Sequence, residues 1–363
     1  MGFDRRKFMG TIAGLALLRS SYANAQIDNS VHQSLLNIAE GNYVEPIILP
    51  RAIYPGSTIA ITAPASATSP GEISSCVNYL KKNKCKVIIG DTVTKWKTSN
   101  RYFSAEDEER AEEFMQFIKS DEIDAVICAR GGYGVMRILP LLDFGIIRDK
   151  AKPVIGFSDI TALVNAIFLK SRIVSFHGPV AVVNFSGLTS QSFNQTLFRD
   201  KTKSHEKNIQ TIVINYPGAS VLNPGVVTGK LIGGNLSMLT ATLGTPYEID
   251  TKDSILFIEE VFEEPYKIDR MLTQLLLAGK FTECKGIILG KFKNLDLKKN
   301  FFPGYQFTVR QILDQLVKTL NKPTLMGIPL GHGDEIITMP IGIYAELDAT
   351  KKIIKLLEQP VTI

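Results

Sequence analysis

One stretch of the chain, in which an apolar strand pattern runs into a glycine, a serine and a helix pattern, constrains the fold most. The strand pattern covers residues 153–155 and the helix pattern residues 161–170, so the chain must reverse within the five residues between them. A turn this short places Ser158 at the start of a helix, with its side chain facing outward and backbone N–H groups nearby. Ile160 stands where the G-x-S-x-G elbow of hydrolases has its second glycine, so that motif is matched only in part. Taken alone, the stretch also fits a serine that only caps the helix.

A glycine-rich loop, ARGGYG at residues 129–134, follows a second apolar strand pattern and precedes a helical pattern at residues 135–142. The paired glycines Gly131 and Gly132 let backbone amides approach a ligand closely, and helix N-termini favour negative charge. Such a loop suits the oxyanion that develops during acyl transfer, and a phosphate is the alternative ligand. A nucleotide has little support, because the chain has neither a P-loop pattern nor an acidic residue spaced for a ribose.

Two further segments supply a base and an acid. His332 is flanked by glycines in a segment, residues 327–333, that is too irregular for a core strand. Glu259 follows an apolar strand pattern at residues 254–258 and is expected at a strand end, where catalytic residues gather in sheet proteins. Glu260 is expected on a solvated face or in the cap of the next helix. The chain order serine, acid, histidine is that of α/β-hydrolases and indicates covalent acyl transfer.

The other histidines and the cysteines show no comparable arrangement. His177 follows an apolar strand pattern and is expected to be a hydrogen-bonded structural residue. His32 and His205 lie in polar surroundings, and no two histidines or cysteines have the spacing of metal ligands. The sequence therefore predicts hydrolysis without a metal or cofactor. Whether Cys76 and Cys85 form a disulfide stays open.

Strand and helix patterns alternate through the first half of the chain. This alternation predicts an α/β fold with a parallel, Rossmann/flavodoxin-like sheet that has helices on both faces. The glycine loop and the serine turn both follow strands, at the carboxyl edge where such sheets bind ligands. The patterns lie at residues 58–63, 86–89, 125–128 and 154–155 for strands and 105–119 for a helix.

The length of the chain indicates two domains, since the 338 residues after residue 25 exceed one ordinary core. We expect an N-terminal α/β domain at residues 50–190 with the nucleophile, a polar linker at 191–224, and a smaller, mostly-β domain with helices at 225–363. The last domain carries Glu259 and His332, so the active site is expected between the domains. Its patterns lie at 226–231, 254–258, 286–290, 343–347 and 352–357 for strands and at 234–243 and 269–278 for helices.

Residues 1–25 have the three ordered elements of an export signal. They are the pair Arg5-Arg6, an apolar run at residues 8–18 that is too short to span a bilayer, and the cleavage site Ala-Asn-Ala before Gln26. We predict a twin-arginine signal peptide and a periplasmic protein, with the cytoplasm as the location if the signal is not used. Cleavage leaves no membrane span. The remaining 37 basic and 35 acidic residues give a net charge of +2, which makes no case for nucleic-acid binding.

Several longer motifs identify a family. They are ARGGYG (129–134), RILPLLD (137–143), GFSDITAL (156–163), HGP (177–179), GGNLSML (233–239), LFIEEVFEEPYKIDRML (256–272) and GIPLGHG (327–333). Together they resemble the LD-carboxypeptidase family of serine peptidases, which includes the microcin C self-immunity proteins. The motifs occur in the family's order, and the resemblance covers nearly the whole chain after the signal.

The resemblance implies a function and roles for three residues. Ser158 resembles the nucleophile, His332 the general base, and Glu259 the group that orients the histidine. The implied reaction releases the terminal D-alanine from a muropeptide tetrapeptide. A related amide hydrolase that inactivates a peptidyl-nucleotide antibiotic is the alternative, and a protein that binds a ligand in the cleft without chemistry is a third possibility. A homodimer also stays open.

The resemblance also implies an oxyanion and substrate loop. Its residues are Arg130, Gly131 and Gly132 together with Asp159, which would act through its backbone N–H while its carboxylate serves the turn.

Overall fold

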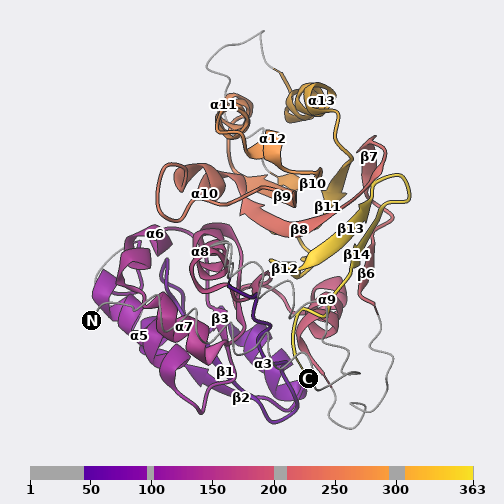
Figure 1. The fold of residues 1–363 in the computed structure, drawn as a ribbon. Helices are drawn as coiled ribbons and strands as arrows, with labels where there is room; N and C mark the ends of the chain where they lie inside the picture. The colour runs from indigo at the N-terminus through magenta and orange to yellow at the C-terminus, as the bar shows by residue number, and fades with distance from the viewer. Residues whose placement is uncertain (1–44, 96–101, 200–210, 294–306, 363) are drawn as a thin grey trace, which may run out of the picture. The chain divides into compact units, whose positions relative to one another are not determined.

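The computed structural model describes residues 45–95, 102–199, 211–293 and 307–362, and Ile47–Ile363 form one compact unit. Within this unit the strands form two separate sheets, one mainly from the N-terminal part and one from the C-terminal part (Figure 1). This confirms the predicted α/β fold class. The predicted signal peptide, His32 and His205 lie outside the described residues.

The first sheet has the strand order β12-β5-β4-β3-β1-β2, and its strands β1 to β5 are all parallel. Strand β3 is buried along its whole length, as expected for a continuous apolar run in a sheet that is covered on both faces. The strands are β1 (Thr58–Thr62), β2 (Lys86–Ile89), β3 (Ala125–Cys128), β4 (Val154–Gly156), β5 (Ser175–His177) and β12 (Met339–Ile341). Strand β12 comes from the far C-terminal part and pairs antiparallel with β5, so the chain returns to the first sheet after His332.

Helix α8 connects the two halves of the fold. It packs on β4 and β5 of the first sheet and also contacts β8 and α10 of the second half. A helix covered on several sides is apolar nearly all round, which explains the run TALVNAIFLK. The helices of the first half are α3 (Ser74–Lys82), α4 (Asp91–Thr94), α5 (Asp107–Lys119), α6 (Val135–Ile138), α7 (Phe144–Lys150), α8 (Thr161–Ser171) and α9 (Gly187–Leu197).

The second sheet has the order β6-β14-β13-β8-β9-β10-β11-β7, with a parallel centre from β8 to β11 and antiparallel strands on both sides. Its strands are β6 (Val213–Asn215), β7 (Ser220–Asn223), β8 (Val226–Asn235), β9 (Ser254–Val261), β10 (Gly286–Lys293), β11 (Thr324–Ile328), β13 (Tyr344–Asp348) and β14 (Ile353–Leu356). The helices of this half are α10 (Leu236–Ala241), α11 (Pro265–Leu277), α12 (Lys280–Glu283) and α13 (Val309–Leu320).

The structure differs from the prediction in the segment 191–224, which we expected to be a linker. Most of α9 lies in it, and β6 and β7 form the two outer strands of the second sheet. The polar composition conceals helix α9, because polar side chains of this helix bond to the backbone of a distant segment. Thr189 Oγ1 accepts a hydrogen bond from Ile336 N at 3.0 Å, and Ser192 Oγ accepts one from Thr338 N at 3.0 Å.

Strand β8 is longer than its sequence pattern indicates. It continues to Asn235, so Gly233 belongs to the strand, and so does Gly234, which we predicted to begin a helix. Both glycines permit close packing: a Cβ at Gly233 would lie 1.9 Å from the Phe257 carbonyl oxygen, and one at Gly234 would lie 2.5 Å from Thr161 Cγ2. The consequence is that Asn235 lies at the carboxyl end of β8.

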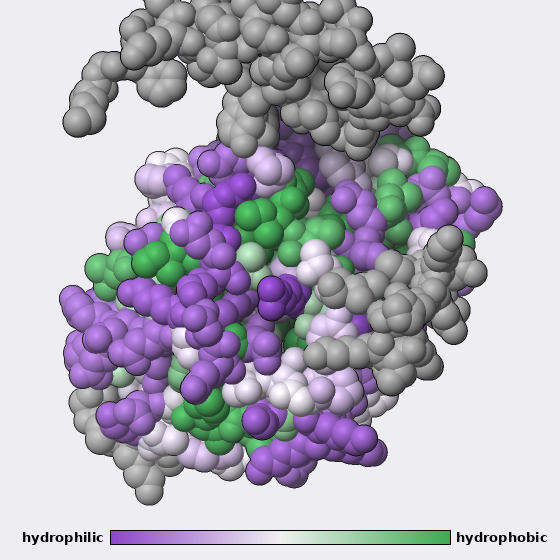
Figure 2. Space-filling view, turned by 60° about the horizontal axis from the view of Figure 1, so that its bottom comes forward, coloured by the Kyte–Doolittle hydropathy of each residue, from purple (hydrophilic) through white to green (hydrophobic). Residues whose placement is uncertain are grey.

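The four cysteines are buried free thiols: Cys76, Cys85, Cys128 and Cys284. Cys76 and Cys85 are therefore not paired, and burial raises the pKa of the Cys85 thiol to about 11. Hydrophilic side chains cover much of the face drawn in Figure 2, and the hydrophobic residues on it form separate groups. Within the described ranges, no helix is both long and apolar enough to cross a membrane.

Candidate active site

Ser158 occupies a sharp turn between β4 and α8. Its φ of +65° lies in the left-handed region, which residues with a Cβ rarely adopt and which is found more often at active sites than elsewhere. A 3₁₀ turn at Ser158–Ile160 leads from the strand into the helix. A Cβ at Gly156 would lie 2.6 Å from Ile160 Cγ2, so the glycine before the turn makes room for the isoleucine. This packing explains how the turn forms although Ile160 replaces the second glycine of the hydrolase motif.

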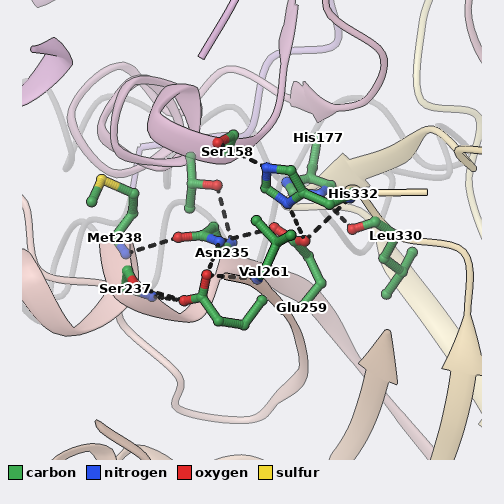
Figure 3. Close-up of polar contacts among 11 residues, drawn as sticks. Ser158, His177, Asn235, Ser237, Met238, Glu259, Val261, Leu330 and His332 are labelled. Carbon is green, nitrogen blue, oxygen red and sulfur yellow. Dashed lines mark hydrogen bonds and ion pairs between the residues drawn. The ribbon is translucent and has the colours of Figure 1, made fainter. Parts of the chain in front are cut away.

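The structure brings Ser158, His332 and Glu259 together in a chain of hydrogen bonds (Figure 3). His332 Nε2 lies 3.1 Å from Ser158 Oγ, and His332 Nδ1 lies 2.8 Å from Glu259 Oε2. The same carboxylate oxygen also accepts a hydrogen bond from the backbone N of His332 at 3.4 Å. The Glu259 side chain is fully buried, whereas the His332 side chain is 21% exposed. Glu259 thus holds both the ring and the backbone of the histidine from the interior.

Two glycines provide the space for the Glu259 side chain. A Cβ at Gly331 would lie 2.6 Å from Glu259 Oε2, and one at Gly290 would lie 2.8 Å from Glu259 Cβ. Gly331 also has a φ of +135°, a conformation that is essentially restricted to glycine. The glycine before His332 is therefore required both for its backbone conformation and for access of the carboxylate to the histidine.

The glycine loop lies directly against the serine. A Cβ at Gly131 would lie 2.7 Å from Ser158 Cβ, 3.0 Å from Ser158 Oγ and 3.2 Å from the backbone N of Asp159. Gly132, at a φ of +101°, is packed equally closely against Ser66. Ser66 fixes the loop from behind, since its N donates to Gly131 O at 3.3 Å and its Oγ accepts from Tyr133 N at 3.0 Å. Of the predicted loop residues, Gly131 and Asp159 therefore lie at Ser158, whereas Gly132 packs against Ser66.

The end of the glycine loop is held by two buried ionisable side chains, those of Asp159 and Arg110. The Asp159 carboxylate accepts a hydrogen bond from Val135 N at 2.9 Å, and the Arg110 guanidinium donates to Gly134 O at 3.2 Å. Burial raises the pKa of Asp159, although the bond from Val135 and the charge of Arg110 oppose this shift. Arg130, in contrast, is exposed and lies 3.7 Å from Glu72 as an ion pair. It forms no hydrogen bond or ion pair with Ser158 or His332, both of which the structure describes.

His177 supports the segment that carries His332. It is completely buried, between the rings of Phe157 and Phe257 at centroid distances of 6.1 and 5.4 Å. Burial lowers the pKa of His177, which favours the neutral ring. Its Nε2 lies 3.2 Å from the carbonyl oxygen of Leu330, which accepts a hydrogen bond when Nε2 carries the proton. This contact fits the structural role that the sequence predicts for His177.

The prediction for Glu260 is wrong. Glu260 is not solvated but 2% exposed, because β9 continues to Val261 and carries this side chain into the interior. Asn235, whose role the sequence does not predict, joins the two carboxylates: its Nδ2 lies 3.2 Å from Glu259 Oε1 and 3.0 Å from Glu260 Oε1. The motif GGNLSML contains the only signal for it, a polar residue at the end of an apolar run.

The described residues contain no group of three or more His, Cys, Asp or Glu side chains that could hold a metal ion. The groups gathered at this site are the serine, the histidine, the buried carboxylates and the amides of the glycine loop. A serine at a strand–helix turn, bonded to a histidine that a buried carboxylate orients, is an arrangement used in acyl transfer. The fold and the site thus define the class of α/β proteins with a serine–histidine–carboxylate site.

Family models identify the particular group within this class. The model of the LD-carboxypeptidase N-terminal domain matches residues 59–178, and that of the LD-carboxypeptidase C-terminal domain matches residues 228–347. The chain belongs to the LD-carboxypeptidase family, and it is accordingly a member of a family of hydrolases.

Individual relatives agree with this assignment. A probable murein peptide carboxypeptidase of Bacillus subtilis is 35% identical over 309 residues, which are 84% of this chain and 92% of that protein. The microcin C7 self-immunity protein MccF of Escherichia coli is 28% identical over 332 residues, 84% of this chain and 94% of that protein. The solved structure of a muramoyltetrapeptide carboxypeptidase from Oxalobacter formigenes superposes with a TM-score of 0.69 at 30% identity, covering 83% of this chain and 98% of that one.

Proposed function

We propose that this protein is a serine carboxypeptidase that releases the terminal D-alanine from muropeptide tetrapeptides. The observation that carries the proposal is the unbroken chain of hydrogen bonds from Ser158 through His332 to Glu259. Murein peptide and muramoyltetrapeptide carboxypeptidases among the relatives support the substrate class.

Ser158 acts as the nucleophile in the first half of the reaction. Its Oγ attacks the carbonyl carbon of the bond between the L-centre of the peptide and the D-alanine, while His332 Nε2 accepts the hydroxyl proton. The ring then donates this proton to the departing amino group, and free D-alanine leaves. Glu259 accepts a hydrogen bond from Nδ1–H throughout, so it keeps the ring in the required tautomer and stabilises its charged form.

The glycine loop stabilises the tetrahedral intermediates by hydrogen bonds from its backbone amides. The amides of Gly131, Gly132 and Asp159 are the candidate donors to the oxyanion, because Gly131 and Asp159 N both lie against the Ser158 side chain. In the second half of the reaction a water molecule, deprotonated by His332, attacks the acyl-enzyme. This step releases the shortened peptide with a new carboxylate and returns the proton to Ser158.

A second candidate function is hydrolysis of an amide bond in a peptidyl-nucleotide antibiotic. It is favoured by the likeness to the self-immunity protein MccF, which extends over 84% of this chain. The same catalytic steps would apply, and only the acyl and leaving groups differ. The two candidate functions therefore differ in how the substrate is recognised, whereas the catalytic residues are the same.

Mass spectrometry of the products tests the substrate assignment. The purified protein, starting at Gln26, is incubated separately with a muropeptide tetrapeptide and with a peptidyl-nucleotide that has an amide linkage. We expect the tetrapeptide to lose one alanine and the nucleotide to stay intact or to react far more slowly. Preferential cleavage of the nucleotide would establish the second candidate, and no turnover of either compound would favour a binding protein.

A further inference from the structure

Glu260 is a buried carboxylate that the reaction described above does not use. Its Oε1 accepts hydrogen bonds from Asn235 Nδ2 at 3.0 Å and from Val261 N at 2.8 Å. Its Oε2 accepts from Ser237 N at 2.8 Å and from Ser237 Oγ at 2.6 Å. Burial raises the pKa of Glu260, and the bonds from these donors oppose that shift. All four donors are neutral, so hydrogen bonds hold the Glu260 side chain in place, and none of them is part of an ion pair.

The Asn235 amide has a single orientation that satisfies its neighbours. Its Oδ1 accepts a hydrogen bond from Met238 N at 3.3 Å and so caps helix α10. The NH₂ group then faces Glu259 and Glu260, which can only accept when they are ionised. If the Asn235 amide turned over, its oxygen would meet both carboxylates and its NH₂ group would meet the amide of Met238. The two carboxylates therefore fix the orientation of the Asn235 amide, and the amide in turn fixes the carboxylate of Glu259.

The same asparagine is tied to the helix that begins at the nucleophile turn. The backbone N of Asn235 donates to Thr161 Oγ1 at 3.1 Å, and Thr161 is the first residue of α8, three positions after Ser158. A closed circuit of contacts thus runs from the serine turn through Asn235 and Glu259 to His332 and back to the serine (Figure 3). Glu260 contacts this circuit at Asn235, through its Oε1.

We propose that Glu260 is a positioning residue for the catalytic carboxylate: it holds the Asn235 amide so that the amide keeps Glu259 Oε2 directed at His332. The proposal rests on the proposed function, since it assumes that Glu259 and His332 serve Ser158. Changing a residue that orients a metal-binding side chain typically costs about 10- to 100-fold in activity, and we expect a loss of the same order for a residue that orients a catalytic carboxylate.

The variant that tests the proposal is Glu260→Gln, which keeps the size of the side chain but adds an NH₂ group. That group must face either Asn235 and Val261 or the backbone N of Ser237, and in both orientations it opposes an N–H donor. Glu260→Asp keeps the charge and shortens the side chain, and it provides a second variant if the glutamine variant does not fold. Glu248→Gln is the matched control, because Glu248 also holds a backbone amide, Gly244 N at 2.6 Å, but this bond and its ion pair with Lys280 lie outside the active site.

Two measurements are made on the folded variants: kcat and KM for D-alanine release, and the far-downfield proton NMR signal of His332 Nδ1–H. We expect Glu260→Gln to lower kcat by about 10- to 100-fold with KM little changed, and to shift or broaden the His332 signal. Glu260→Asp should show the same changes to a smaller extent. Glu248→Gln should keep both kcat and the signal, whatever its effect on stability.

Wild-type kcat and an unchanged His332 signal in Glu260→Gln, or in Glu260→Asp if only that variant folds, would overturn the proposal. A fall in melting temperature without either change would overturn it too, since it would show a purely structural role. Ser158→Ala, measured alongside, separates this failure from failure of the proposed function. If Ser158→Ala keeps turnover, the assignment of the nucleophile is wrong, and the role of Glu260 falls with it.

Discussion

At the scale of single residues, the site depends on positions where a side chain is missing. A Cβ at Gly331 would clash with Glu259, and a Cβ at Gly131 would clash with Ser158. Gly331 also has a backbone conformation that favours glycine. The glycines in the motifs GIPLGHG and ARGGYG are therefore explained by the space they leave. Flexibility of the loops is not needed to account for them.

Gly331→Ala should strongly reduce activity, because the new Cβ would displace the Glu259 carboxylate from His332. A misplacement of about 1 Å can cost roughly 100-fold in rate, and we expect at least that loss in kcat/KM. Gly56→Ala is the control: its φ of +100° is also unfavourable for alanine, but a Cβ there meets nothing within 4 Å. Steady-state kinetics of both variants test this prediction, and a Gly331→Ala enzyme as active as Gly56→Ala would contradict the steric argument.

Asp159→Asn should change how stability depends on pH. Since burial raises the pKa of Asp159 above its value in the unfolded chain, about 3.9, its contribution to stability is fully present below about pH 4. That contribution is lost as the pH rises through the raised pKa, because the native state must then bury a charge. Asparagine keeps the acceptor for Val135 N and does not titrate. Urea unfolding from about pH 4 to 7 should show the wild type losing stability relative to the variant.

The quantity to compare is the free energy of unfolding of the wild type minus that of Asp159→Asn. If this difference stays constant or increases as the pH rises from about 4 to 7, the raised pKa of Asp159 is contradicted. The comparison uses the difference between the two proteins, so other titrating groups cancel as long as they do not interact with Asp159. Arg110 is the charged group whose interaction with Asp159 the structure shows, and it stays charged throughout the range.

At the scale of elements, the turn between β4 and α8 holds the nucleophile in a conformation that costs free energy. A residue with a Cβ loses roughly 1–2 kcal/mol in the left-handed region, whereas glycine adopts it freely. Ser158→Gly should therefore be more stable than Ser158→Ala by about 1 kcal/mol, although neither variant has a nucleophile. Urea unfolding of the two inactive variants measures the strain without any contribution from catalysis.

Ser190 provides the matching control within helix α9, where the backbone is regular. There the order should reverse, because glycine in a helix interior is less stable than alanine by about 1 kcal/mol. The same order of stability at both positions would show that the turn at Ser158 is not strained.

The elements with clear periodic patterns were predictable, and those that depend on partners were not. Strands β2 and β3 have the predicted bounds, and the patterns place the serine turn and the glycine loop after β4 and β3. The burial of Glu260 could not be predicted, because it depends on Asn235 and Ser237 from another segment of the chain. Similarly, β12 is a strand only because it pairs with β5, and no local pattern indicates that partner.

At the scale of the whole molecule, neither sheet contains the complete site. Ser158 and the glycine loop follow strands of the first sheet, whereas Glu259 lies on β9 of the second, and His332 lies in the segment between β11 and β12. Chain order, serine then acid then histidine, predicted which residues belong together. The sequence could not show how they meet, since that requires α8 to pack against β8 and α10.

The N-terminal 25 residues lead us to propose that this protein is exported in the folded state. Arg5→Lys with Arg6→Lys keeps both charges but should block export, because the twin-arginine pair is read by a receptor and not as charge alone. Fractionation should find protein starting at Gln26 in the periplasm for the wild type and the full-length precursor in the cytoplasm for the variant. Equal periplasmic amounts of the two proteins would remove the twin-arginine assignment.

The most direct test of the account is the effect of Ser158→Ala on the release of D-alanine from a muropeptide tetrapeptide. The account predicts that the folded variant binds the tetrapeptide while kcat/KM falls by roughly 10⁴- to 10⁶-fold, the loss typical of removing a catalytic serine. A folded Ser158→Ala protein whose kcat/KM stays within about tenfold of the wild type, a difference of only about 1.4 kcal/mol, would contradict it.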